Sequence, residues 1–327
     1  MRKVLHVGPC HSPGGMATVM HTLADHPPHG WIASLLSSHA EGGIRKKWKA
    51  YRIARKKINK VCSNNSDRPD VIHLHAAADW SWRRKLRLIR IAQHHDVPCI
   101  VHLHSGQFDD WLIDGGQKRQ KHVRSVLEEK GVQGVVLSNA WNERLSPLIG
   151  SLEVVNNPLP PHEQKDNAAR NGDHLLLLGR ADPVKGHAFA VDLVAALRTV
   201  FPKLRLTLTG TSNSEHDWVD SLGWVSEKEK SRLVASASIL LIPSAFEGQP
   251  MVALEALSAG LPVCASDRVV GLPDTVQTAA YNDVEAWVEV VSGILRHPPE
   301  AKLLMASVAH YSVVEVQHRW KTLYESL

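Results

Sequence analysis

Cysteine and long apolar runs are both scarce in this sequence, and each shortage excludes a class of protein. The four cysteines among 327 residues lie far apart and form no CxxC pair, so neither a cysteine zinc site nor a disulfide framework is indicated. No stretch approaches the roughly 20 apolar residues that cross a bilayer. In the opening residues, MRKVLHVGPC, a short apolar run leads into glycines rather than a cleavage site. We therefore expect a cytoplasmic protein without a signal peptide.

Charge is distributed unevenly along the chain, although the net charge is only +5. Residues 1–160 hold 23 Lys and Arg against 13 Asp and Glu, whereas residues 161–327 hold 15 against 20. A chain of this length also exceeds one typical domain core. We therefore expect two domains that differ in the sign of their net charge.

Short apolar runs alternate with longer amphipathic segments, as in proteins with parallel sheets. The expected strands cover residues 3–7, 31–36, 70–75, 98–104 and 134–138, and later 174–180, 204–210 and 238–244. Helical patterns separate them, including residues 16–25, 83–95, 187–201, 229–237, 250–260 and 283–296. The alternation predicts the α/β class with doubly wound parallel sheets.

A polar, proline-bearing segment interrupts the alternation at residues 156–173, NNPLPPHEQKDNAARNGD, and is typical of an exposed linker. We therefore expect an N-terminal domain over residues 1–157, a C-terminal domain over 158–305 and a final helical segment over 306–327. Two such domains create a cleft. Ligands of open parallel sheets bind at the carboxyl ends of the strands, so the loops there are the places to search.

Residues 246–263, FEGQPMVALEALSAGLPV, place two carboxylates around a helix start. Pro250 suits a first helical turn because it has no N–H to lose. The backbone N–H groups beside it attract phosphate, while Glu247 and Glu255 can accept hydrogen bonds from vicinal hydroxyls. Hydroxyls beside phosphate describe a nucleotide sugar. Two glutamates alone are more often ordinary helix acids. The N–H groups concerned belong to Gly248, Gln249, Met251 and Val252.

A second charged loop lies upstream, in LLLLGRADPVKGHAFAVD. Arg180 follows a predicted strand and Lys185 comes five residues later, which puts two cations at the mouth of the same sheet. Such cations can neutralise a diphosphate. By itself the pattern is weak, because loop arginines and lysines are usually solvated.

Together these loops resemble the signatures of retaining glycosyltransferases of the GT-B fold, in particular family 4 members of the exopolysaccharide type. The shared features are E-x7-E, trailed by Gly260-Leu261-Pro262-Val263, and G-R-x(4)-K-G roughly 60 residues upstream. The resemblance implies two Rossmann-like domains facing a central cleft, with the last helix crossing back to the first domain. It implies that Arg180 and Lys185 stabilise the departing diphosphate, that Glu247 binds donor-sugar hydroxyls and Glu255 the ribose, and that the backbone of residues 248–252 holds the distal phosphate.

Further donor contacts are expected from loops with little side-chain signature. Gly14-Gly15 follows the first strand without forming GxGxxG, and no acid completes a dinucleotide fingerprint. Such a pair lets backbone approach a ligand closely, and the family has a similar loop beside the donor phosphates. By the same resemblance Gly210 and Thr211 border the nucleotide, and backbone near Val225 contacts the base. Uridine, guanosine and adenosine donors all remain open.

Histidines end two of the predicted strands. His104, in IVHLHSGQ, can hydrogen-bond an acceptor hydroxyl or the sugar from the carboxyl end of its strand. Its loop resembles the family's H-x-H-G segment, with Ser105 in place of glycine, which implies that His104 belongs to the catalytic centre. His75 is expected on the acceptor side, with a core role as an equal alternative, and His102 in the core.

No metal site is predicted from these histidines. The pairs at residues 73 and 75 and at 102 and 104 are assigned to alternating inward and outward positions on separate strands, and no cysteine or carboxylate repeats with ligand spacing. Asp109-Asp110 is not a D-x-D triad. The resemblance implies an enzyme that needs neither a metal nor any other cofactor, with Arg180 and Lys185 in the place of the cation.

Residues 44–60, IRKKWKAYRIARKKINK, include nine Lys or Arg. With Trp48 among the charges they predict a basic helix that binds an anionic membrane surface, here the cytoplasmic face, and residues 81–91, SWRRKLRLIRI, extend it. The alternative is a solvated basic helix; nucleic acid is not expected, because no recognised module is present. The patch consists of Arg45, Lys46, Lys47, Lys49, Arg52, Arg55, Lys56 and Lys57.

The function predicted from the sequence is glycosyl transfer with retention, from a nucleoside-diphosphate sugar to a hydroxyl of a glycan or a lipid-linked acceptor. Two alternatives stay open at this point. A GT-B sugar-nucleotide epimerase would share the donor cleft but need acid and base carboxylates near the sugar. A basic surface-binding protein without catalysis would need none of the four charged residues of the two loops.

Overall fold

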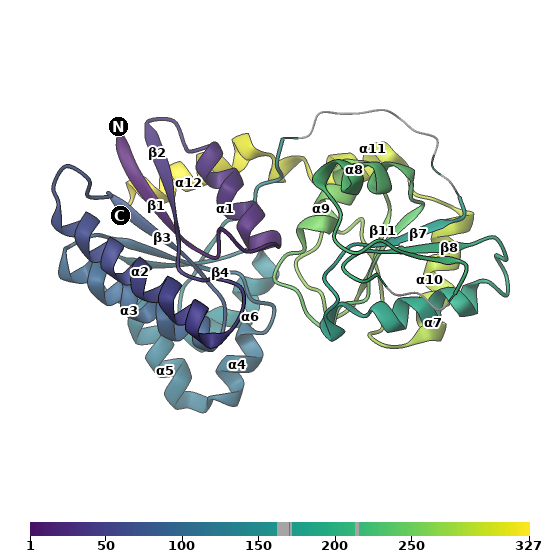
Figure 1. Ribbon diagram of the computed structural model, residues 1–327, viewed down its shortest axis with the longest axis horizontal. Coiled ribbons are helices and arrows are strands. Elements are labelled where there is room, and N and C mark those ends of the chain that lie inside the picture. The colour runs from purple at the N-terminus through teal and green to yellow at the C-terminus, as the bar shows by residue number, and fades with distance from the viewer. Residues whose placement is uncertain (162–169, 171, 213–215) are drawn as a thin grey trace. The chain divides into compact units, whose positions relative to one another are not determined.

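A computed structural model describes residues 1–161, 170, 172–212 and 216–327. The chain divides into two compact units, Met1–Pro161 with Tyr311–Leu327 and His162–His310 (Figure 1). The first unit thus extends a few residues beyond the predicted boundary at 157, and its second segment begins at residue 311 rather than 306. Most of the expected linker lies outside the described residues.

The first unit contains a parallel sheet in the order β2-β1-β3-β4-β5-β6. Its strands are β1 (Arg2–Gly8), β2 (Trp31–Ser37), β3 (Val71–Ala76), β4 (Cys99–Leu103), β5 (Val132–Val136) and β6 (Glu153–Val154). After β2 the chain crosses to the other side of β1 and continues outward. The strand order therefore reverses between β1 and β3, which is where open α/β sheets bind ligands.

The helices of the first unit bury faces set by their apolar spacing. They are α1 (Gly15–Asp25), α2 (Ile44–Ser63), α3 (Trp80–His94), α4 (Phe108–Asp114), α5 (Gly116–Leu127), α6 (Asn139–Ile149) and α12 (Val313–Glu325). On α2 the buried residues Tyr51, Ala54, Ile58 and Cys62 follow the helical period, and charges cover the remainder. On α12, Trp320 and Tyr324 are buried in this unit.

The second unit repeats the design with a sheet in the order β12-β11-β10-β7-β8-β9, again parallel. Its strands are β7 (His174–Leu177), β8 (Arg205–Leu208), β9 (Val219–Ser221), β10 (Ile239–Ile242), β11 (Val263–Ser266) and β12 (Gln277–Ala279). Its helices are η1 (Pro183–Lys185), α7 (His187–Leu197), α8 (Glu227–Ser236), α9 (Met251–Ser258), α10 (Val284–Arg296) and α11 (Ala301–Ser307). The short helix η2 (Ala309–Tyr311) follows, and its last residue already belongs to the first unit. The strand order reverses between β7 and β10.

The core of the second unit lies between its sheet and the helices α7 and α10. Fully buried Trp287 packs there with Leu193 and Leu206, and its indole N–H donates to the carbonyl of Ala280. Within the described parts of the chain, no helix has both the length and the apolar character needed to span a bilayer.

Candidate functional site

The two charged loops of the second unit lie side by side, because each follows one of the neighbouring strands β7 and β10. Gly186 has φ 73°, and a Cβ there would lie 2.8 Å from the carbonyl oxygen of Pro243. The backbone N–H of Ala245 donates to the carbonyl of Val184 at 2.9 Å. Only glycine allows this approach, so Gly186 brings the two motifs together at the carboxyl edge of the sheet.

Lys185 and Glu247 form an ion pair in this edge. Their Nζ and Oε1 atoms are 2.5 Å apart, and the hydroxyl of Ser244 donates to the same carboxylate oxygen at 2.9 Å. Both side chains keep some exposure, 25% for Lys185 and 15% for Glu247. The guanidinium of Arg180 is exposed, and no carboxylate among the residues described here pairs with it. The structure therefore brings Lys185 and Glu247 into contact, and the same loop as Lys185 carries Arg180.

Glu255 has a cationic partner that the sequence reasoning missed. Its carboxylate is 5% exposed on α9, and Nζ of Lys230 on α8 lies 3.0 Å from Oε2. Burial disfavours the charge of Lys230, but Glu255 and Glu227 more than offset this, so its pKa is raised. A lysine in the run SEKEKSR gives no sequence signal of such a partner 25 residues away.

The expected nucleotide loop is shaped by another close approach. Gly210 has φ 79°, and a Cβ there would lie 2.2 Å from the carbonyl oxygen of Gly179. Its N–H donates to the carbonyl of Gly223. The glycine is thus required by packing against the loop that carries Arg180, whatever else it contacts. Thr211 and Val225 are half-buried, and the carbonyl of Thr211 accepts the N–H of Gly223.

The expected phosphate-holding turn, residues 248–252, offers mainly backbone. The side chains of Gln249, Pro250 and Met251 are buried, and Val252 is half-buried. Gly248 and Gln249 each have an interaction partner in the protein, so their groups are not free as the sequence suggested. Pro250 has no N–H to donate. A ligand at this turn can therefore meet main-chain groups of α9's first residues but few side chains.

Gly14 and Gly15 begin α1 at the carboxyl end of β1, and both are exposed. Gly14 has φ 130°, and a Cβ at this position would meet open space. The carbonyl of Gly14 accepts the N–H of Ala17 in the first helical turn. The exposed backbone leaves room for a close ligand at this end of the first sheet.

Five histidines gather on one face of the first sheet, which corrects the alternation assumed from the sequence. His6 of β1 lies beside His73 of β3 in the parallel register, and His75 lies beside His102 of β4. Positions two apart on a strand point to the same face, so His104 joins the group just after β4. Nδ1 of His75 lies 2.9 Å from Nε2 of His104, and Nδ1 of His6 lies 3.1 Å from Nε2 of His75. We call these five residues the histidine cluster.

The members of the histidine cluster differ in how deeply they are buried. His75 has no exposed surface, so the structure places it in the core, which the sequence left open as an equal alternative; its acceptor-side role stays a prediction. His104 is half-buried and His102 is in the core as predicted. Burial lowers the pKa of His104 to about 3, with a further contribution from the charge of Lys85, and burial lowers the pKa of His75 well below its usual value. The rings are therefore neutral at physiological pH.

Lys85 is a buried cation from a segment that the sequence assigned to the charged surface. It lies on α3 with 3% exposure, and its Nζ donates to the carbonyl of Val7 at 2.9 Å and to the hydroxyl of Ser38 at 2.6 Å. Burial, and then the charge of Arg84, lower its pKa to about 7. The extension of the basic patch along α3 is thus incorrect for this residue.

The predicted basic patch on α2 is exposed along its whole length. Its eight cationic residues all lie at the surface, and Trp48 and Ile53 beside them are 51% and 53% exposed. The neighbouring helix α3 packs against α2 (Figure 1) and adds Trp80, which is 64% exposed. The surface therefore combines charge with exposed aromatic and aliphatic groups.

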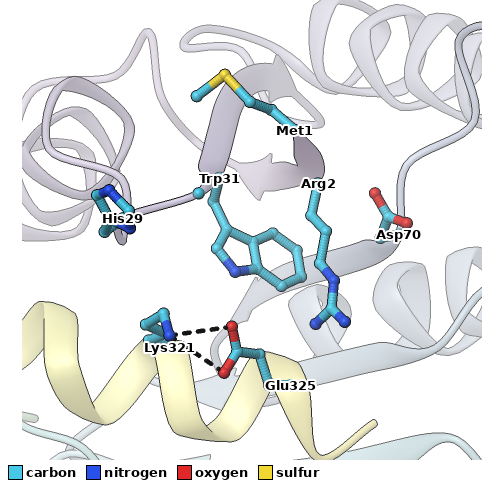
Figure 2. A pocket seen from close by; sticks show the side chains of 8 residues that line it. Met1, Arg2, His29, Trp31, Asp70, Lys321 and Glu325 are labelled. Atoms are coloured by element: carbon cyan, nitrogen blue, oxygen red, sulfur yellow. Dashed lines mark hydrogen bonds and ion pairs between the residues drawn. The ribbon is translucent and has the colours of Figure 1, made fainter.

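A pocket of about 570 Å³ lies elsewhere on the first unit, and Figure 2 shows its lining. Trp31 and Arg2 come from the amino ends of β2 and β1, while α12 adds Lys321 and Glu325, whose charged groups lie 3.3 Å apart. Ligand sites of parallel sheets lie at the opposite, carboxyl edge. None of the predicted site residues lines this pocket.

Comparison with known proteins gives independent evidence on the fold of the chain and on the family that the second unit resembles. Residues 172–297 match the family described as glycosyl transferases group 1. The sucrose-phosphate synthase of Thermosynechococcus elongatus has a TM-score of 0.72 at 16% identity, covering 100% of this chain and 99% of that one. The predicted fold class, α/β with two Rossmann-like, doubly wound parallel sheets of GT-B type, is thereby confirmed.

Curated relatives match at low identity. The chain is 28% identical over 276 residues to the glycogen synthase of Mycobacterium tuberculosis, covering 75% of this chain and 65% of that protein. It is 29% identical over 179 residues to the D-inositol 3-phosphate glycosyltransferase of Mycobacterium avium, covering 47% of this chain and 41% of that protein. The chain thus spans less than two thirds of the length of these relatives. Taken together, the comparisons show the GT-B fold and a likeness of residues 172–297 to glycosyl transferases group 1.

Proposed function

We propose that this protein is a retaining glycosyltransferase that moves a sugar from a nucleoside-diphosphate sugar to a hydroxyl of a glycan or lipid-linked acceptor. One observation carries the proposal: the Arg180 loop and the Lys185–Glu247 pair meet at the carboxyl ends of neighbouring strands, where the sheet order reverses. That is where ligands of such sheets bind. The match of residues 172–297 to glycosyl transferases group 1 supports the same reading.

The charges fit the two ends of such a donor. Arg180, exposed and without a carboxylate partner among the described residues, and Lys185 would meet the diphosphate, with no metal needed to neutralise it. Glu247, held by Lys185 and Ser244, would accept hydrogen bonds from hydroxyls of the sugar. Glu255, fixed by Lys230, would do the same for the ribose. The main chain of residues 248–252 would hold the distal phosphate, and backbone near Thr211 and Val225 the nucleoside.

Retention of the anomeric configuration would proceed by attack on the face from which the diphosphate leaves. The leaving diphosphate itself would take the proton of the acceptor hydroxyl. The protein then needs to position the reactants and stabilise the charge that develops on the diphosphate. In the first unit, half-buried His104 is the group proposed to contact the acceptor or the sugar, and the exposed backbone of Gly14-Gly15 is proposed to approach the donor.

The test compares two arginine variants in an assay of nucleoside-diphosphate release. Arg180→Ala should lower the rate by about 10²–10³, the usual loss when one charge-stabilising donor is removed. Arg205→Ala is the matched control, because Arg205 is exposed at the amino end of β8, away from the carboxyl edge. Equal rates for Arg180→Ala and wild type would refute the assignment. Turnover of the donor alone into another sugar nucleotide would identify an epimerase instead.

We also propose that the basic patch on α2 attaches the protein to an anionic membrane surface, on the cytoplasmic face. The exposed Trp48 and Ile53 among exposed cations support this, since amphipathic basic helices bind lipid through both kinds of group. Lys46→Glu with Lys57→Glu should weaken co-sedimentation with phosphatidylserine vesicles. Lys203→Glu with Lys302→Glu makes the same charge change at exposed positions of the second unit and should not. Equal binding by all three proteins would leave α2 as a solvated helix.

A further inference from the structure

We propose that the histidine cluster of the first unit is a binding site for a divalent transition-metal ion of the zinc type, with His75, His102 and His104 as ligands. Each of the three offers one ring nitrogen, and these nitrogens lie within 4.8 Å of one another. The residues come from the ends of two neighbouring strands, β3 and β4, so the backbone already fixes their spacing. The inference concerns the first unit alone and does not depend on the proposed glycosyl transfer.

One fully buried ring nitrogen of the cluster lacks a hydrogen bond among the described residues. Nε2 of His102 is buried and has no partner among the residues that the structure describes. The side chain of His102 has no exposed surface. A buried polar atom without a partner is costly, and such atoms are rare in native proteins. A metal ion at this nitrogen would remove the cost.

The hydrogen bonds of the other rings decide which nitrogens face the ion. Nε2 of His75 lies 3.1 Å from Nδ1 of His6, which leaves Nδ1 of His75 directed at Nε2 of His104, 2.9 Å away. The three ligand atoms are therefore Nδ1 of His75, Nε2 of His102 and Nε2 of His104. The ion takes the place of the hydrogen bond between His75 and His104, and the proton of that bond moves to the outer nitrogen of its own ring.

In two of the three ligands, His75 and His102, the second ring nitrogen has a partner of the kind that metal-bound histidines use. Metal ligands usually donate their second ring N–H to a neighbouring acceptor, which fixes the orientation of the ring. Here His75 would donate to His6, and Nδ1 of His102 would donate to Nε2 of His73, 3.1 Å away. His73 would in turn donate from Nδ1 to the hydroxyl oxygen of Tyr324 at 2.8 Å. Each ring stays neutral with its N–H on the outer nitrogen, so no proton has to leave.

The metal class follows from the ligands and their spacing. Zinc binds imidazole nitrogen at about 2.0–2.1 Å, so tetrahedral ligands lie about 3.3–3.4 Å apart. Nδ1 of His75 and Nε2 of His104 must separate slightly from 2.9 Å, and His102, whose ring centre is 4.1 Å from that of His104, must turn inward. A set of imidazoles suits zinc, copper, nickel or iron and not the oxygen-binding calcium or magnesium. Half-buried His104 gives the ion a route into the site.

The test uses the full chain, stripped with a chelator and dialysed against Zn²⁺ or Co²⁺ buffered in the micromolar range. We expect one bound equivalent, a higher melting temperature with Zn²⁺, and the visible absorption bands of tetrahedral Co²⁺. His102→Gln and His104→Gln should each abolish the Co²⁺ bands. His94→Gln, an exposed histidine outside the cluster, should keep them.

Several outcomes would overturn the site. One is no bound equivalent under these conditions, and another is a Co²⁺ spectrum that survives both cluster substitutions or disappears equally in His94→Gln. If circular dichroism shows that the two cluster variants do not fold, X-ray absorption of Zn²⁺ bound to the wild-type protein counts its imidazole ligands. Three imidazoles would support the site, and fewer would show that the ion binds surface histidines.

Discussion

Lys85 allows a direct test of what it costs to bury a charge in the first unit, because its ammonium group is buried beside neutral acceptors. Replacing it with methionine keeps the length of the side chain and removes the charge. Its hydrogen bonds to the Val7 carbonyl and the Ser38 hydroxyl are lost in the variant. Of the charged and titratable groups around it, Arg84 opposes the charge and Cys10 favours it weakly. The question is how much burial of the charge destabilises the first unit.

The magnitude follows from the pKa, which falls from 10.5 to about 7 on folding. At about 1.4 kcal/mol for each pH unit, this corresponds to a penalty of about 5 kcal/mol. Below pH 7 both states are protonated and the full penalty applies. Between pH 7 and 10.5 the unfolded state binds the proton and the native state does not, so this group's contribution to the free energy of unfolding rises with pH. Above 10.5 the penalty is gone.

Lys85→Met should therefore be more stable than wild type at pH 6 by about 2–4 kcal/mol, after subtracting about 1–3 kcal/mol for the lost hydrogen bonds. The gap should shrink by about 4 kcal/mol by pH 10. Urea unfolding followed by tryptophan fluorescence measures this, since seven of the ten tryptophans belong to the first unit. Lys60→Met, at an exposed position on α2, removes the same charge and controls for net charge. A gap independent of pH would refute the reasoning.

Two further substitutions test the packing and pairing of the second unit. Gly210→Ala should lower the free energy of unfolding of this unit by at least about 3 kcal/mol, because the new Cβ would lie 2.2 Å from the carbonyl oxygen of Gly179. Gly223→Ala is the control, because Gly223 also has a positive φ but a Cβ there would meet open space. It should cost about 1 kcal/mol when both variants are unfolded in urea. Lys230→Met should destabilise the unit by about 3–5 kcal/mol, because it leaves the carboxylate of Glu255 buried without its cation. Adding Glu255→Leu should restore the melting temperature, and a double variant no more stable than the single one would contradict the pairing.

The sequence predicts the strands and helices that carry strong patterns and misses the ones that are too short to have any. The strands β1 to β5 and β7, β8 and β10 overlap the expected strands, each of which contains several apolar residues. The strands β6, β9 and β12 contain two or three residues, and such lengths show no alternation. All three close the edges of a sheet. Their formation depends on a neighbouring strand already in place, which local pattern does not record.

The sequence likewise predicted some features of the candidate donor site and missed others. Spacing within a motif predicted which charges follow β7 and β10, because a strand and its loop are local in the sequence. The partner of Glu255 is Lys230, on another helix, and nothing near either residue indicates that pairing. Gly210 is conspicuous only once the loops are folded, since its role is to let two backbones touch.

The histidines are far apart in the sequence, and the register of the paired strands brings them together. His6 stands in a strand that reads simply as apolar, and only the alignment of β1 with β3 brings it beside His73. The error in the sequence reasoning was to treat positions two apart as facing opposite ways. With the period of a strand applied correctly, both pairs could have been placed on one face, although His6 would still have been missed.

The division of the first unit between residues 1–161 and 311–327 has a consequence for biosynthesis. Trp320 and Tyr324 are buried among residues of the amino-terminal segment, and they leave the ribosome only after the entire second unit has been made. Residues 1–161 therefore lack part of their core while roughly half of the chain is still being translated, and the surface that Trp320 and Tyr324 later cover stays exposed. The second unit can fold as soon as its own residues emerge, so the part synthesised first is completed last.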